Sequence, residues 1–137
     1  MTLLRKFWSL SSEKRRLLLR TAVLLALLRV ALSLSSFVRL KKYLARRAVL
    51  HPMPQCVSVD QIVWAVRTAA AYVPGATCLT QALAAKYQLE RSGRHGRIHI
   101  GVAKDKGQFS AHAWLEYEGQ TVLGGGGAGY SRLIAVE

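Results

Sequence analysis

Two residues of the chain have the types and local contexts that thiol chemistry needs. Cys78 lies in the segment PGATCLTQ, where Pro74 and Gly75 end one helical pattern and the cysteine opens the next. His112 lies in the segment FSAHAW, within an alternating pattern that is typical of a strand. A thiol reacts as its thiolate, and both the positive end of a helix and a neighbouring imidazole stabilise that anion. The pair therefore indicates a cysteine peptidase or an acyl-transfer enzyme.

The two residues would share the proton transfers of such a reaction. The imidazole can take the proton from the thiol and later return it to a leaving amine. Backbone N–H groups at the start of the helix lack intrahelical partners and could stabilise an oxyanion. Gln81, one turn after Cys78, is a candidate for positioning a substrate carbonyl. The competing interpretation is a buried, inert cysteine and a structural histidine, while Cys56, in a proline-rich linker, is assigned no chemistry.

The hydrophobic pattern predicts helices first and strands afterwards, which gives an α+β fold. The stripe Cys78, Ala82, Ala85 and Leu89 has small side chains that let this helix approach a sheet closely. The predicted helices cover residues 12–35, 37–50, 58–73 and 78–91, and the predicted strands cover 97–103, 111–118 and 120–123, with 130–136 as an edge strand or a disordered tail.

Composition predicts one compact unit with a basic N-terminal third. The chain has 137 residues and a formal net charge of +13, and residues 1–50 hold twelve Lys or Arg against one acid. We therefore divide it into a basic, leucine-rich helical region, 1–50, and a catalytic core, 51–137. The basic region has neither the interleaved aromatics nor the motifs of nucleic-acid binders, so we expect no nucleic-acid partner. Two cysteines form no disulfide framework and no metal-ligand cluster, which favours a cytoplasmic protein without a metal.

Residues 17–34 are apolar enough to be tested as a membrane span. Arg20 and Arg29 each cost up to about 3 kcal/mol near the centre of a bilayer, which offsets the gain from the leucines. The two arginines also lie on opposite sides of the predicted helix. We therefore expect neither a single clean span nor a cleaved signal peptide, whereas peripheral membrane contact through residues 12–50 remains open.

Two further patterns are predicted to be structural. His99 alternates with Ile98 and Ile100, so it is expected to be an outward polar residue of a strand. The run of four glycines, 124–127, lacks the lysine and the strand-turn-helix context of a phosphate loop, and we interpret it as a bend.

A family resemblance narrows the chemistry. The segments PGATCLTQALA (74–84), IHIGV (98–102) and FSAHAWLE (109–116) together resemble the transglutaminase-like leader peptidases of lasso-peptide biosynthesis, over about residues 58–123. The resemblance implies a papain/transglutaminase-type fold in which Cys78 is the nucleophile and His112 the general base and acid. It also implies cleavage of a leader from a ribosomally made precursor peptide, a separate ATP-dependent cyclase that closes the ring, and no metal or other cofactor.

The sequence departs from that family in two places. A basic, leucine-rich region of about fifty residues stands in place of the winged-helix domain that recognises the leader in some members, so a separate recognition protein is expected. Relatives commonly carry an aspartate about twelve positions after the histidine, and this position is Gly124. The orienting role could pass to Glu116 or Glu118, or to a backbone carbonyl or water, or the chain could be weakly active. We favour a Cys78–His112 dyad, with transglutaminase-type acyl transfer and a catalytically silent docking scaffold as alternatives.

Overall fold

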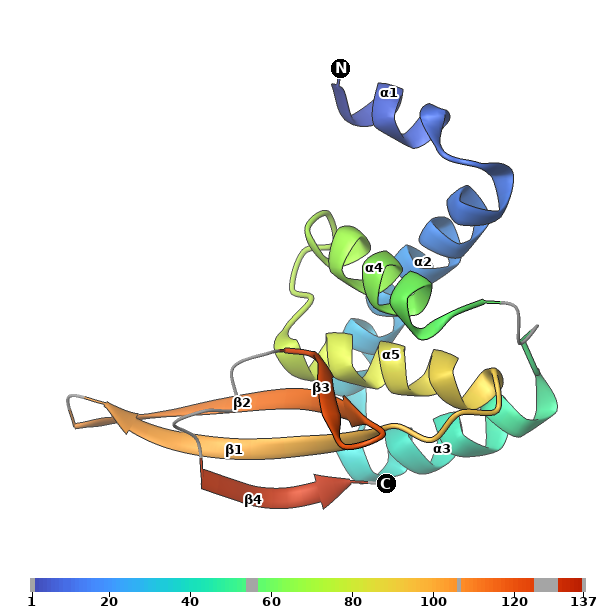
Figure 1. The fold of residues 1–137 in the computed structure, drawn as a ribbon. Helices are drawn as coiled ribbons and strands as arrows, with labels where there is room; N and C mark the ends of the chain where they lie inside the picture. The colour runs from blue at the N-terminus through green and yellow to red at the C-terminus, as the bar shows by residue number, and fades with distance from the viewer. Residues whose placement is uncertain (1, 54–56, 106, 125–130, 137) are drawn as a thin grey trace.

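Helices fill the first two thirds of the chain and strands the last third (Figure 1). The computed structural model describes residues 2–53, 57–105, 107–124 and 131–136. Its helices are α1 (Thr2–Ser9), α2 (Ser12–Leu34), α3 (Phe37–Leu50), α4 (Val59–Ala70) and α5 (Cys78–Arg91), and its strands are β1 (Arg97–Asp105), β2 (Gln108–Tyr117), β3 (Gln120–Leu123) and β4 (Ser131–Val136). This order confirms the α+β fold class.

Side-chain caps explain where the long helices begin. Ser11, Ser36, Ser58 and Thr77 each accept a hydrogen bond from the backbone N–H three residues later, which satisfies one of the free donors of the first turn. At Ser58, the Gln61 side chain returns the bond and completes a capping box. Helix α4 ends at Ala70, three residues before the predicted end, because the amides of the following residues turn back to the Ala69 carbonyl.

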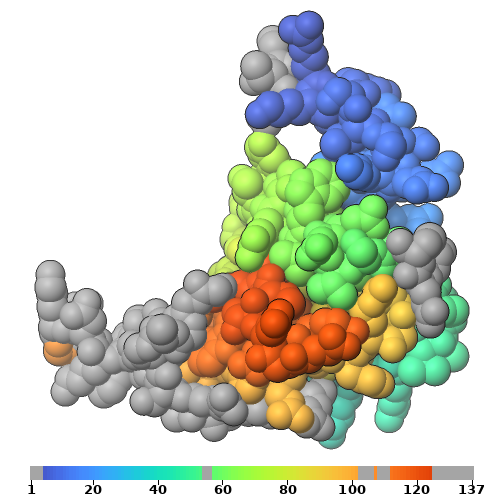
Figure 2. Space-filling view, in the orientation of Figure 1, coloured from blue at the N-terminus to red at the C-terminus, as the bar shows by residue number. Residues whose placement is uncertain are grey.

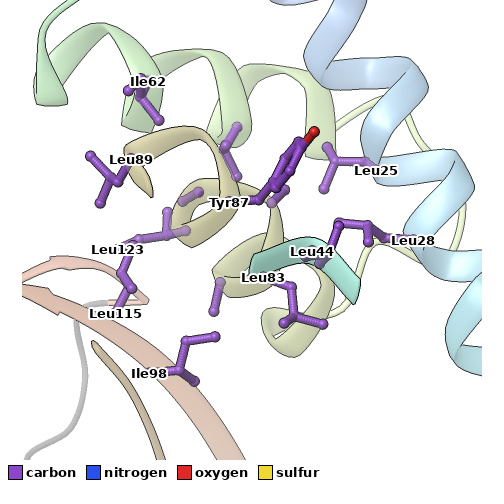
Figure 3. Close-up of a cluster of buried hydrophobic side chains, with 14 of the residues drawn as sticks. Leu25, Leu28, Leu44, Ile62, Leu83, Tyr87, Leu89, Ile98, Leu115 and Leu123 are labelled. Atoms are coloured by element: carbon purple, nitrogen blue, oxygen red, sulfur yellow. The ribbon is translucent and has the colours of Figure 1, made fainter. Parts of the chain in front are cut away.

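Helix α5 is the centre of the hydrophobic core (Figure 3). Every residue from Ala82 to Leu89 is buried, so the helix is covered on all sides by α2, α3, α4 and the sheet. The large side chains of this core come from all of these elements and include Leu25, Leu28, Leu44, Ile62, Leu83, Leu89, Ile98, Leu115 and Leu123. The N-terminal helices α2 and α3 therefore share one core with the cysteine helix.

A buried polar contact fixes α2 against α5. The Gln88 amide nitrogen donates to the Thr21 hydroxyl oxygen at 2.9 Å, and both side chains are almost fully buried. Thr21→Val is expected to destabilise the fold by about 1–3 kcal/mol, because it leaves a buried amide donor without its partner. Urea unfolding should show this loss for Thr21→Val and not for Thr21→Ser, which keeps the hydroxyl. Equal stability of the two variants would contradict a role for the bond.

The strands form one antiparallel sheet in the order β3-β2-β1-β4. The pairing of β1 with β2 sets Gly101 opposite His112 and His99 opposite Trp114. Strand β3 is short and pairs with β2 only between Leu115 and Tyr117, so part of the β2 edge extends past its end. Residues 131–136 form the edge strand β4 on β1, which was one of the two outcomes expected for this segment.

Candidate functional site

Cys78 is the first residue of α5, at the end of a tight turn. The turn passes through Gly75, whose φ of 77° lies in the left-handed region that favours glycine. The Gln81 side-chain amide donates to the Ala76 carbonyl oxygen at 3.1 Å. Gln81 therefore braces the turn that precedes the cysteine. Its role in positioning a substrate carbonyl stays a prediction.

Thr77 holds the start of the cysteine helix. Its hydroxyl oxygen accepts from the Thr80 amide at 3.3 Å and lies 2.9 Å from the Thr80 hydroxyl. Thr77→Ala is expected to cost about 1 kcal/mol of unfolding free energy through loss of the cap and also to slow alkylation of Cys78, because the cysteine follows the cap directly. Ser11→Ala is the matched control, since it removes the cap of α2. An alkylation rate that falls equally in both variants would contradict a local role of Thr77.

Cys78 contacts the edge of β2 next to His112. The Ala113 amide, directly after His112, donates to Cys78 Sγ at 3.4 Å. This amide is free to bond to sulfur because β3 reaches only to the Leu115–Leu123 pair on that edge. Both Cys78 and His112 are half-buried, so the thiol and the imidazole remain reachable from solvent. The structure thus places Cys78 Sγ against the backbone of the residue that follows His112.

The His112 ring is held by a backbone carbonyl. Its Nε2 lies 2.7 Å from the Gly124 carbonyl oxygen. A carbonyl oxygen can only accept a hydrogen bond, so Nε2 carries the proton and, in the neutral ring, Nδ1 carries the lone pair. Nδ1 is then the basic nitrogen of the ring. The position at which the resemblance implied an aspartate therefore contacts the histidine through its main chain.

Gly124 has the backbone conformation and the lack of a side chain that this contact requires. Its φ is 78°, and a Cβ at this position would lie 2.8 Å from the Ala113 carbonyl oxygen. A side chain would collide with the β2 backbone in a conformation that L-residues rarely adopt. The close approach that brings the Gly124 carbonyl to His112 therefore requires a residue without a side chain.

The two glutamates considered as orienting groups lie elsewhere. The Glu116 carboxylate oxygen Oε2 lies 2.8 Å from His99 Nε2, so Glu116 is paired with a different histidine. Glu118 is in the turn between β2 and β3 with a φ of 52°, one residue past the end of β2, and is exposed. The predicted strand 111–118 included Glu118, which is wrong, because β2 ends at Tyr117.

A row of aromatic rings, which the sequence did not reveal, lies next to His112. Trp114 stacks between His112 and His99, with centroid separations of 6.0 Å and 5.6 Å and interplanar angles of 21° in both cases. His99 is only 1% exposed, so the prediction of an outward, solvated residue is wrong. The available signal was the alternation that sets residues 112 and 114 on one face, together with the register that sets residue 99 opposite Trp114.

This arrangement can support nucleophilic chemistry at a carbonyl carbon. The thiol lies at a helix start, where the Cys78 and Leu79 amides precede the first intrahelical hydrogen bonds and can donate to an oxyanion. A histidine of defined tautomer lies one residue from the amide that contacts Sγ. Across the described ranges, no three His, Cys, Asp or Glu side chains gather in a way that could hold a metal ion.

A groove near the helices is separate from this pair. It encloses about 500 Å³ and is lined by Lys6, Phe7, Ser9, Leu10, Leu18, Trp64, Thr68 and Tyr72. These residues come from α1, from α2 and from α4 with the residues that follow it. Figure 2 shows the N-terminal segment, in blue, standing above α4, in green. Neither Cys78 nor His112 lines this groove, so its size carries no argument about the thiol chemistry.

Comparison with known proteins identifies the family. Residues 22–135 match the family described as the transglutaminase-like superfamily, and this range includes both Cys78 and His112. No curated protein and no solved structure matches the chain. Membership of this superfamily suggests cysteine peptidase or acyltransferase activity. Because the match spans most of the sequence, from within α2 to β4, the chain belongs to the transglutaminase-like superfamily.

Proposed function

We propose that this chain is a cysteine peptidase that removes the leader from a lasso precursor peptide. The observation that carries the proposal is the contact of Cys78 Sγ with the Ala113 amide, 3.4 Å away, next to a histidine whose Nε2 lies 2.7 Å from the Gly124 carbonyl. The superfamily match supports thiol chemistry at a carbonyl carbon. The leader-peptidase assignment is supported by the sequence segments around Cys78 and His112.

The proposed reaction proceeds through an acyl-enzyme. His112 Nδ1 takes the proton from Cys78 Sγ, and the thiolate forms a bond to the carbonyl carbon of the scissile peptide. The resulting oxyanion accepts hydrogen bonds from the amides of Cys78 and Leu79. The C–N bond then breaks, and the leaving amine of the core takes the proton from His112. A water molecule, deprotonated by the same imidazole, hydrolyses the thioester and releases the leader with a free carboxylate.

The partners of the proposed reaction follow from what the N-terminal region contains. The described part of residues 1–50 is three helices, without the β-hairpin of a winged-helix domain. A separate leader-recognition protein would therefore deliver the precursor to Cys78, and an ATP-dependent cyclase would consume the released core. All of these components would act in the cytoplasm, where a free thiol stays reduced.

The proposal is tested by product analysis. The protein is incubated with its precursor peptide and the recognition protein, and the products are measured by mass spectrometry. We expect a leader with a free carboxylate and a core with a free amine, and no cleavage by the Cys78→Ala variant. An amide cross-link to an added amine in place of hydrolysis would identify an acyltransferase.

A silent scaffold would leave the precursor intact. It would also leave Cys78 no more reactive than Cys56 toward a thiol-selective reagent, because an activated thiolate should react faster than an ordinary thiol. Cleavage retained after Cys78→Ala would overturn the assignment of the nucleophile. These outcomes separate the peptidase from both alternatives.

A further inference from the structure

Helix α2 has an apolar face that the rest of the chain does not cover. Its 23 residues are long and apolar enough to cross a membrane by length and composition, yet only 17% of its most apolar window is buried. The residues that point away from the core have side chains exposed by 55–83%. We call these five residues the outer stripe: Leu19, Val23, Leu27, Val30 and Leu34.

The outer stripe is continuous along one side of the helix. Its members follow each other at intervals of three or four residues, which sets them on one face. The opposite face carries Thr21, Leu25 and Leu28, which are buried against the core. At a rise of about 1.5 Å per residue, the stripe is about 23 Å long. An exposed apolar surface of this length is typical of an interaction site.

Positive charge flanks the outer stripe. Arg16 and Arg20 extend the same face toward the N-terminus and are exposed. Elsewhere in the basic region, Lys42 and Arg46 of α3 are exposed as well. Residues 1–50 as a whole hold twelve basic residues and one acid. The surface thus combines large aliphatic side chains with arginines and lysines, which is the composition of helices that lie in the interface of anionic membranes.

Two other occupants fit this surface less well. A second copy of the chain would bring together two molecules of charge +13, and their like charges repel. A spanning helix would need lipid on all sides, whereas α2 packs against α4 and α5 and bonds through Thr21 to Gln88. We infer that the outer stripe docks peripherally on an anionic lipid bilayer, with α2 lying in the plane of the interface. This inference does not depend on the reaction at Cys78.

The inference is tested by flotation of the full-length protein with vesicles. Vesicles of phosphatidylcholine alone are compared with vesicles that also contain phosphatidylglycerol, at low and at high salt. Leu27→Ser removes one member of the outer stripe, with an exposed fraction of 63%, and Tyr72→Ser is the matched control, with an exposed fraction of 60% away from the stripe. Both variants keep the net charge of the chain, and circular dichroism checks that both remain folded.

We expect binding to the anionic vesicles that weakens as salt shortens the screening length. Leu27→Ser should lower the partition coefficient by about tenfold through the loss of one buried leucine, and Tyr72→Ser should leave it unchanged. Equal partitioning of the two variants would overturn the inference. Binding that resists extraction with alkaline carbonate would also overturn it, because such binding indicates a spanning helix. A third contradicting result is a wild-type protein that does not bind vesicles but forms a concentration-dependent dimer, which Leu27→Ser dissociates.

Discussion

Cys78→Ala and His112→Ala are each expected to lower kcat/KM for precursor cleavage by about 10⁴-fold, and the double variant is expected to be no worse than either single one. The reason is that the thiol and the imidazole act in one step. Without His112 the thiol lacks the base that takes its proton, and without Cys78 the imidazole has no nucleophile to activate. Non-additivity is the signature of groups that work as a unit.

The measurement is the initial rate of core release for the three variants and the wild type, under identical concentrations of precursor and recognition protein. His95→Ala is the matched control, because His95 is an exposed histidine of the loop before β1. Its rate is expected to stay within about twofold, as is usual for an exposed surface substitution. A shared step would be contradicted if the double variant lost the product of the two single losses in kcat/KM. Normal cleavage by His112→Ala would show that the histidine takes no part in the mechanism.

The sequence was sufficient to predict the elements that carry this pair. Ser and Thr caps, a Pro-Gly break and a change from helical to alternating period are local signals, and the helices from Ser12 and Cys78 begin at the predicted residues. The small residues of α5 predicted that the helix packs closely on the sheet; Ala82 and Ala85 are buried, and α5 contacts β2. Local signals of this kind need no knowledge of the tertiary structure.

The parts of the site that depend on the sheet edge could not be predicted in the same way. The Ala113 amide can bond to Cys78 Sγ only because the pairing of β3 with β2 stops before Ala113. The number of residues over which two strands pair is a property of the folded sheet and not of the local sequence. The sequence likewise offered Glu116 as an orienting residue but did not reveal that it pairs with His99 of the neighbouring strand β1. Of the proposed substitutes for the missing aspartate, the backbone carbonyl is the one that the geometry supports.

The contact of the Gly124 carbonyl with His112 leads to the second prediction with a large effect, which concerns an aspartate at position 124. Gly124→Asp is expected to reduce cleavage by about 100-fold or more, although it introduces the residue type that the sequence resemblance implied for this position. A Cβ at this position would lie 2.8 Å from the Ala113 carbonyl oxygen and 3.1 Å from Trp114 Cα, so the backbone must move. Movement of the Gly124 carbonyl removes the acceptor that fixes the His112 tautomer, and misplacement of a catalytic group by about 1 Å can cost about 10²-fold.

Gly119→Asp is the matched control for this experiment. Gly119 also has a positive φ, of 79°, but a Cβ there would meet nothing within 4 Å. The control therefore has only the left-handed strain, about 1–2 kcal/mol, whereas Gly124→Asp adds a backbone clash of about 1–3 kcal/mol. Urea unfolding measures the two stabilities, and cleavage rates are compared at a temperature where both variants are folded. Faster cleavage by Gly124→Asp than by the wild type would show that the histidine lacks an orienting partner in the natural chain, and that the Gly124 carbonyl does not supply one.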